Sequence, residues 1–397
     1  MHYPKCICGA FFFAAPPRQI MKRIKLGISI SLTGAYSVQG AQSFRGLSLY
    51  VSDVNERGGI HVAQLERKVP VDLVHFDDES DVDKCRSNVE KLLSQEQVDI
   101  LLGPYSSSLA LAAAEEAEPR GVTLWNHGGS TDEMDERGFT CLVSTITPAS
   151  MYSRGIIALV RKTDPGALKI ASFSAFDSGF SRNVSRGVDK YGAEYGFEVK
   201  RFEFRTGRED FSGLLPEAMD WGPDLVIGMG RLNDDLLLAG RMIDTGAKPK
   251  AAALAAASIG LFRETFGDYA EGFMSSTQWE RAGGKDPDAG PTSEEFFERY
   301  KATYGHAPDF VAAQGYNICV VIEECIGRAG VLDRRTLRDI AREIDFRTFY
   351  GRFKTDARGS QKGHEMVTVQ WQGGGKVVVY PESSAHGRLT YPARFNF

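Results

Sequence analysis

Short apolar stretches alternate with amphipathic helical stretches along most of this chain, and this alternation restricts its fold more than any other feature. Residues 25–32 (KLGISISL) are typical of a buried strand, and a helix with apolar residues three or four apart follows at about 40–57. The same series continues with predicted strands at 69–76, 98–102 and 122–125 and helices at 81–94 and 108–118. Strands separated by helices predict a doubly wound, mainly parallel α/β sheet with right-handed crossovers.

A second series of the same kind begins near residue 148. Its predicted helices are 149–162, 180–195, 211–221 and 234–245, and its predicted strands are 168–174, 197–204, 224–229, 251–257 and 273–277. A chain of 397 residues is long for one ordinary domain. Two α/β lobes are therefore expected.

The last third of the chain departs from the alternation. Three successive helices are predicted at 293–304, 310–328 and 335–344, and a glycine-rich turn at 372–375 joins strands 367–371 and 377–380 in a hairpin. The economical arrangement returns the chain to the first lobe and then crosses back. No Pro/Ser-rich linker separates the series, so we expect short hinge crossings. The predicted division is 24–147 plus 279–345 for lobe 1, and 148–278 plus 346–397 for lobe 2.

The charge pattern excludes one class of partner. The net charge is -5, and Lys and Arg form no basic stripe. Nucleic-acid binding needs clustered Lys and Arg, so we expect no nucleic-acid partner.

The first residues resemble an export signal. His2 and Lys5 precede an apolar run at 7–15, which Pro16-Pro17 ends. The run is shorter than the roughly 20 residues that span a bilayer, and no later stretch is long and apolar enough for a transmembrane helix. We expect a leader at 1–23 and a periplasmic protein; without a cleaved leader the protein would be cytoplasmic.

Six cysteines are spread thinly, and no CxxC pair occurs. We interpret Cys85, Cys141, Cys319 and Cys325 as small buried apolar residues. A disulfide in an oxidising compartment is the alternative, and no pairing follows from the sequence.

Most enzyme signatures are missing. There is no GxxxxGK[ST] or GxSxG motif, and His364-Glu365 lacks a second histidine because position 368 is Thr368. Residues 228–233 (GMGRLN) resemble a dinucleotide fingerprint but end in Asn where glycine is needed, so we interpret them as a tight strand-to-helix turn that lines a cleft. A doubly wound enzyme is therefore disfavoured, and we expect no cofactor and no metal site.

Two loops that follow strand ends are candidate binding elements, because open α/β sheets bind ligands there. The loop 103–108 places Tyr105, Ser106 and Ser107 at a helix start, where unpaired N–H groups and the helix dipole attract carboxylates. Alternatively, one serine serves only as a helix cap. In the loop 126–131 the candidate ligand-binding residues are His127, Gly128, Gly129 and Ser130. Adjacent glycines allow the backbone to approach a ligand, although an ordinary turn uses them too.

At these residues the chain resembles the periplasmic type I solute-binding proteins of the branched-chain amino acid and amide ABC transporter family, such as leucine/isoleucine/valine-binding proteins. The order and spacing of six stretches between Ile24 and Tyr380 carry the resemblance. They are 32–40 (LTGAYSVQG), 55–60 (NERGGI), Asp77-Asp78, 103–107 (GPYSS), 126–130 (NHGGS), and 350–356 (YGRFKTD) with Gly359 and Gln361.

The resemblance implies a monomeric, non-enzymatic binder. Its two lobes would be joined by three hinge crossings, and it would close on a small ligand and dock on the membrane permease of an ABC importer. By position, Ser107, the Gly128 backbone and the Ser130 hydroxyl would hold the carboxylate of the ligand. The opening loop would contribute Tyr36 and Gln39, and the second lobe would contribute Phe180 and Arg231. An intracellular ligand sensor of the same fold, acting on a regulatory partner, is the alternative.

The chain departs from the family pattern at one informative place. Amino-acid binders of this family hold the ammonium group with an acidic residue of the second lobe, whereas the matching stretch 251–257 contains none. A buried ammonium without a partner costs several kcal/mol. The departure disfavours a plain α-amino acid, and an inward-pointing Arg231 would favour an acidic or amide ligand. Aromatic carboxylates, amides and short polar metabolites all stay open as ligands. The family's disulfide is not evident either, because Ser80 stands near the place of its first cysteine.

Overall fold

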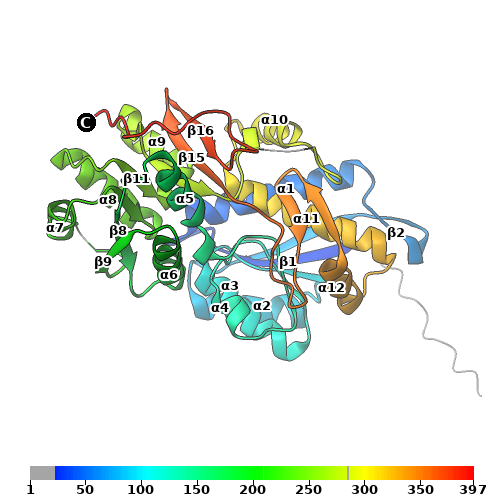
Figure 1. Ribbon diagram of the computed structural model, residues 1–397. Coiled ribbons are helices and arrows are strands. Elements are labelled where there is room, and N and C mark those ends of the chain that lie inside the picture. The colour runs from blue at the N-terminus through cyan, green and yellow to red at the C-terminus, as the bar shows by residue number, and fades with distance from the viewer. Residues whose placement is uncertain (1–22, 209, 284–285) are drawn as a thin grey trace, which may run out of the picture.

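Two α/β lobes lie side by side in the computed structural model, which describes residues 23–208, 210–283 and 286–397 (Figure 1). The sheet of lobe 1 has the strand order β4-β1-β5-β6-β7 and is parallel throughout. Its strands are β1 (Ile24–Ile30), β4 (Val71–Asp77), β5 (Ile100–Leu102), β6 (Leu124–Asn126) and β7 (Leu142–Ser144). The helices of this lobe are α1 (Ser37–Glu56), α2 (Val82–Ser94), α3 (Ser107–Ala117), α4 (Glu133–Glu136), α10 (Ser293–Tyr304), α11 (Phe310–Ala329) and α12 (Arg334–Glu343).

The sheet of lobe 2 has seven strands in the order β16-β15-β12-β11-β10-β8-β9. They are β8 (Lys169–Ala175), β9 (Glu198–Phe204), β10 (Leu225–Gly228), β11 (Ala251–Leu254), β12 (Met274–Thr277), β15 (Val367–Gln372) and β16 (Gly375–Tyr380). The helices are α5 (Arg154–Thr163), α6 (Gly179–Glu194), α7 (Leu214–Asp220), α8 (Leu232–Thr245) and α9 (Gly260–Phe266). At one edge of this sheet β15 pairs antiparallel with both β12 and β16, and the other neighbouring strands are parallel. The predicted class of two doubly wound, mainly parallel α/β lobes is confirmed, as is the hairpin at the glycine-rich turn.

Helix α1 packs closely along α11 in lobe 1, and two glycines make this possible. A Cβ atom on Gly46 would lie 2.0 Å from the carbonyl oxygen of Ala312, and one on Gly315 would lie 2.5 Å from that of Ser43. These distances are far below van der Waals contact, so each helix meets the backbone of the other. The late helix α11 is thereby part of the lobe 1 core, as the predicted return of the chain to lobe 1 requires.

The predicted boundary of lobe 2 at residue 346 is wrong. The hairpin of β13 (Asp345–Thr348) and β14 (Gly351–Lys354) turns Phe346 and Phe353 inward, where they join the lobe 1 core. The backbone N–H of Ser144 also donates to the carbonyl of Gly359 at 2.8 Å. The predicted boundary follows the last helix of lobe 1, whereas burial of these two phenylalanines keeps the chain in lobe 1 through the β13–β14 hairpin.

Several short elements of the fold are not predicted from the sequence. The strand β7 has three residues, and the hairpin of β2 (Ile60–Val62) and β3 (Arg67–Val69) is equally short. The stretch 251–257 was predicted as one strand but leaves the sheet after Leu254 and continues as a 3₁₀ turn at Ala255–Ser258. Such lengths are too small for a periodic pattern.

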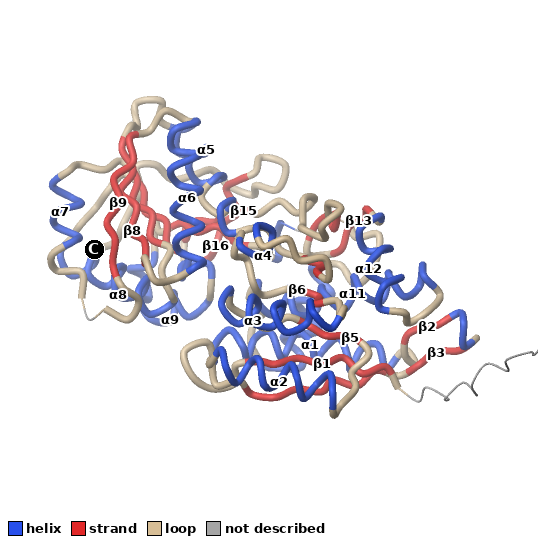
Figure 2. The backbone as a smooth tube through the Cα atoms, turned by 90° about the horizontal axis from the view of Figure 1, so that it is seen from below, coloured by secondary structure: helices blue, strands red, loops and turns tan. Residues whose placement is uncertain are grey.

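Three crossing segments meet between the lobes. The side-chain Oε1 of Gln278 accepts from the backbone N–H of Thr147 at 3.2 Å, and Nε2 of Gln278 donates to the backbone carbonyl of Thr147 at 3.1 Å. The hydroxyl of Thr147 lies 2.8 Å from Nδ1 of His364. The ring of His364 also stacks on Tyr350, with centroids 4.8 Å apart, and burial lowers its pKa to about 4. One residue from each crossing therefore takes part in a single buried cluster. Figure 2 shows the two lobes from below, with backbone segments passing between them.

Cys85, Cys141, Cys319 and Cys325 are buried and unpaired with one another, which confirms their interpretation as small buried residues. The predicted leader lies outside the described residues except for Arg23. Across the described ranges, no helix has the length and apolar character needed to cross a membrane.

We predict that Gly46→Ala lowers the free energy of unfolding by about 1–3 kcal/mol, because the added methyl group forces α1 away from α11. Urea unfolding followed by circular dichroism measures the change. Gly327→Ala is the matched control: it lies in the same α11, where nothing lies within 4 Å of an added Cβ. The control is expected to gain up to about 1 kcal/mol from helix propensity. Equal effects of the two substitutions would contradict the close-packing argument.

Candidate functional site

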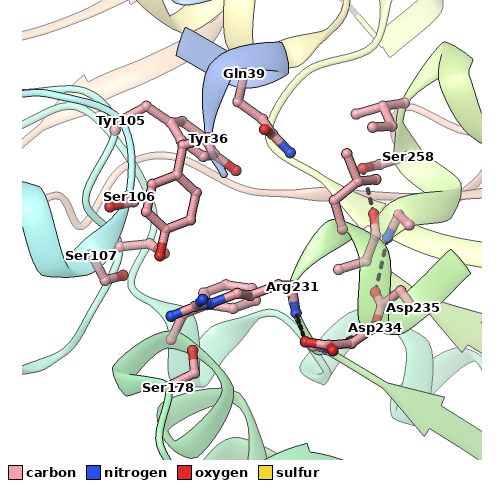
Figure 3. Close-up of a pocket in the computed structure, with 18 of the residues that line it drawn as sticks. Tyr36, Gln39, Tyr105, Ser106, Ser107, Ser178, Arg231, Asp234, Asp235 and Ser258 are labelled. Atoms are coloured by element: carbon pink, nitrogen blue, oxygen red, sulfur yellow. Dashed lines mark hydrogen bonds between the residues drawn. The ribbon is translucent and has the colours of Figure 1, made fainter. Parts of the chain in front are cut away.

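A cavity of about 360 Å³ opens between the lobes, and both lobes line it (Figure 3). Lobe 1 contributes the start of α1 and the loops before α3 and after β6, while lobe 2 contributes the starts of α6 and α8 and the turn after β11. Nine of the predicted site residues line this cavity: Tyr36, Gln39, Tyr105, Ser106, Ser107, Gly128, Ser130, Phe180 and Arg231. The tertiary structure therefore brings together residues that the sequence separates by nearly 200 positions.

Two predicted site residues do not line the cavity. His127 is fully buried, with Nε2 2.7 Å from the hydroxyl oxygen of Ser43, and burial lowers its pKa to about 3. A Cβ on Gly129 would lie 2.2 Å from that of Ala110, so Gly129 packs against α3. The loop presents alternate residues to opposite sides. His127 and Gly129 therefore face the core while Gly128 and Ser130 face the cleft.

The serines before α3 have separate roles. Ser106 caps the helix: its hydroxyl accepts from the backbone N–H of Leu109 at 3.3 Å and lies 3.3 Å from the Ser108 hydroxyl. Ser107 is half-buried, and its hydroxyl has no hydrogen-bond partner among the described residues. The alternative of a capping serine thus applies to Ser106, and Ser107 keeps its hydroxyl available at the positive end of the helix.

Gly128 is required by the close approach of the two lobe 1 loops. A Cβ there would lie 2.5 Å from the carbonyl oxygen of Pro104 and 2.6 Å from Cα of Tyr105. The backbone N–H of Ser106 donates to the Gly128 carbonyl at 3.3 Å. The glycine thus joins the two loops into one wall of the cavity.

Arg231 crosses the cavity from lobe 2. It precedes α8 in the turn that was predicted to line a cleft, and its guanidinium lies 5.7 Å from the ring centroid of Tyr36 in lobe 1. Its side chain is exposed, and among the described residues its guanidinium N–H groups form no hydrogen bond or ion pair. A cation with unused donors in a cleft is suited to bind a carboxylate.

Acidic residues do line the lobe 2 side, although the stretch 251–257 contains none. Asp235 accepts backbone N–H groups of Gly230 at 2.7 Å and Ala256 at 3.0 Å, and burial raises its pKa to about 7. Asp234 accepts from the backbone N–H groups of Gly207 at 2.8 Å and Arg231 at 3.2 Å. Both carboxylates hold loops in place. The sequence signal was their position in the first turn of a helix, where acidic residues commonly bind backbone N–H groups.

Aromatic rings form much of the remaining wall. The rings of Tyr36 and Tyr105 meet edge-to-face at 6.4 Å on the lobe 1 side, and those of Tyr152 and Phe180 do so at 5.3 Å on the lobe 2 side. The Tyr152 hydroxyl accepts from Nε2 of Gln278 at 2.9 Å, which ties the wall to the hinge cluster. Phe310, the first residue of α11, also lines the cavity. Tyr152 and Phe310 both lie in ordinary amphipathic helical patterns, so the sequence gives no sign that they line a site.

Contacts of residues 131–136 of lobe 1, which include α4, with α6 of lobe 2 join the two lobes beside the cavity. Nδ2 of Asn183 donates to the hydroxyl of Thr131 at 2.6 Å. Arg186 pairs with Glu136 at 3.0 Å, and Arg182 pairs with Glu133 at 3.5 Å. These ion pairs are half-exposed, so each contributes at most about 1 kcal/mol and is screened by salt.

We predict that the double variant Glu133→Gln, Glu136→Gln has a larger radius of gyration than the wild type at low salt, because the lobes lose both ion pairs. Small-angle X-ray scattering of the ligand-free protein measures it. Salt should expand the wild type and leave the variant unchanged. Glu382→Gln is the control, since its partner Lys162 lies in the same lobe. Identical radii for wild type and double variant at low salt would show that these pairs do not hold the lobes together.

Comparisons with known proteins agree with this geometry. A sequence profile described as "Periplasmic binding protein" matches residues 23–376. Leu/Ile/Val-binding protein homolog 7 of Brucella abortus (strain 2308) is 26% identical, over 93% of this chain and 94% of its own. The leucine binding protein LivK of Thermotoga maritima has a TM-score of 0.78 at 22% identity, covering 89% of this chain and 97% of its own. A solute binding protein from R. palustris in complex with benzoate has a TM-score of 0.75 at 21% identity, covering 94% and 96%.

This chain belongs to the periplasmic binding protein family, because the family profile covers nearly all of its described residues. The family is not enzymatic, and the protein is a solute-binding protein of the kind that serves ABC transporters.

Proposed function

We propose that the protein is the extracytoplasmic component of an ABC importer and binds a small organic carboxylate in the cleft between its lobes. The observation that carries this proposal is the position of Arg231, which extends from lobe 2 into a cavity whose lobe 1 side bears Ser107 at a helix start. A carboxylate placed between them would accept hydrogen bonds from both lobes. Binding would then stabilise the closed arrangement, because only that arrangement supplies both sets of donors.

The environment of the cavity supports a carboxylate without an ammonium group. Asp234 and Asp235 already accept backbone N–H groups, and Asp177 accepts the backbone N–H and the hydroxyl of Thr206 at 2.9 and 2.8 Å. An ammonium group would have to compete with these donors. The aromatic wall favours a flat, apolar body, because ring contacts add to the burial of apolar area. We infer that aromatic and similar organic acids fit better than leucine or valine.

The similar proteins include binders of both kinds. LivJ of Streptococcus pneumoniae was solved in complex with isoleucine, and proteins from R. palustris were solved with benzoate and with 3,4-dihydroxy benzoic acid. The fold therefore accommodates either ligand, and the side chains of this cavity decide between them. The family and the resemblance of the first residues to an export signal support a periplasmic location and a permease partner.

A thermal-shift screen followed by titration calorimetry tests the proposal. The panel contains benzoate, its hydroxylated forms, benzamide, leucine and valine. A ligand that binds only the folded protein raises the melting temperature. We expect a shift with aromatic carboxylates and little or none with leucine and valine. A strong shift with leucine alone would contradict the proposed ligand class, and no shift with any acid would contradict carboxylate binding.

Two substitutions should separate the roles of the lobes. Ser107→Ala should weaken carboxylate binding by about 1–3 kcal/mol, the usual loss for a hydrogen bond to a charged group.

Arg231→Met should weaken benzoate binding at least about tenfold and affect benzamide less, since only benzoate carries the charge. Calorimetry measures both. Arg201→Met is the control, because Arg201 on β9 pairs with Asp189 on α6 and does not line the cavity. Equal losses for benzoate and benzamide would rule out a charge role for Arg231.

A further inference from the structure

Gln39 presents an unsatisfied amide at the cavity wall. It lies in the first turn of α1, is only 8% exposed, and lines the cavity. Its Oε1 is fully covered and has no hydrogen-bond partner in the described part of the chain. Leaving a buried polar group unpaired costs free energy, because the group loses its hydrogen bonds to water and gains none in the protein. A side chain with that cost at a binding site suggests that the ligand supplies the missing partner.

Most other buried polar groups of the cavity are already paired within the protein. The hydroxyls of Ser258 and Ser276 donate to the backbone carbonyls of Ala255 and Tyr152. Nε2 of Gln278 donates to the backbone carbonyl of Thr147 in the hinge cluster and to the hydroxyl of Tyr152. Gln39 differs from them, since its amide forms no hydrogen bond to a described residue.

The position of Gln39 is remote from the groups proposed to hold the carboxylate. In Figure 3 its side chain extends into the cavity from one side, while Arg231 and Ser178 approach from the opposite side and Ser107 lies at a third. A ligand whose carboxylate is held at Ser107 and Arg231 can therefore direct another part of itself toward Gln39. Tyr36, three residues earlier on the same helix start, would contact the body of such a ligand.

We propose that Gln39 is a specificity-determining residue that pairs with a neutral hydroxyl or carboxamide group on the ligand, remote from its carboxylate. The proposal rests on the carboxylate binding proposed above and narrows the ligand to substituted acids. A neutral group fits because an amide offers both a donor and an acceptor but no charge to balance a buried ion. Rotation about its last side-chain bond exchanges the end that faces the cavity, so either a donor or an acceptor on the ligand can be paired.

The test compares matched ligands on matched variants by titration calorimetry. The ligands are benzoate, meta- and para-hydroxybenzoate, and the monoamide of terephthalic acid. The wild type should bind at least one substituted acid about tenfold or more tightly than benzoate, as expected for one good hydrogen bond to a group that is otherwise unpaired. Gln39→Met, similar in length and without polar atoms, should bring that ratio close to one and leave benzoate affinity equal or improved.

The control is Gln42→Met on the same helix. Oε1 of Gln42 accepts from the Tyr300 hydroxyl at 2.6 Å, and Gln42 does not line the cavity. This variant should melt at a lower temperature than the wild type and keep its preference among the ligands. Ligand-free Gln39→Met should melt at an equal or higher temperature, because it removes an unpaired buried oxygen.

The outcomes distinguish this inference from the function on which it rests. Equal wild-type affinity for benzoate and every substituted acid would overturn the role of Gln39 while leaving carboxylate binding intact. An equal loss of all ligands in Gln39→Met would also overturn it, since the residue would then be a structural support. Failure of all four acids to bind the wild type would contradict the proposed function and this inference with it.

Discussion

A buried hydrogen-bond cluster at the hinge ties together the three segments that cross between the lobes. Thr147, Gln278 and His364 each belong to a different crossing segment, and their side chains bond one another or the backbone beside them. Because burial lowers the pKa of His364, its imidazole is neutral at neutral pH and adds no charge to the cluster. Gln278 also reaches the Tyr152 hydroxyl in the cavity wall. The hinge that positions the lobes thus also positions a wall of the binding site.

The cavity has two kinds of polar group, and the difference between them gives the site its chemistry. The carboxylates of Asp234 and Asp235 accept hydrogen bonds from backbone N–H groups and so hold the lobe 2 loops in place. Ser107, Arg231 and Gln39 have hydrogen-bonding capacity that no described residue uses. A ligand gains most from groups of the second kind, since pairing them costs the protein no existing bond. The composition of a cavity wall is therefore a poor guide to its ligand until these bonds are counted.

The long elements of the fold could be predicted because their patterns are local. A helix such as α11 or a buried strand such as β1 has enough residues to show its period and its apolar face. The two cleft loops could be predicted too, since parallel strands end at a common edge of the sheet. The inward turn of Phe346 and the outward placement of Gly128 between His127 and Gly129 could not. Both depend on which neighbour fills the adjacent space, and that neighbour is distant in sequence.

The amino-acid sequence is enough to predict the two-lobed α/β class, the family resemblance and most of the residues around the cleft, because strand–helix alternation and the residues at strand ends are local features of the chain. The folded structure is needed to tell which of those residues face the cavity, which acids are already bonded, and that Gln39 has an unpaired oxygen. Hydrogen-bond satisfaction is a property of a packed environment. Its donors and acceptors come from segments far apart in the chain, and only folding brings them within bonding distance.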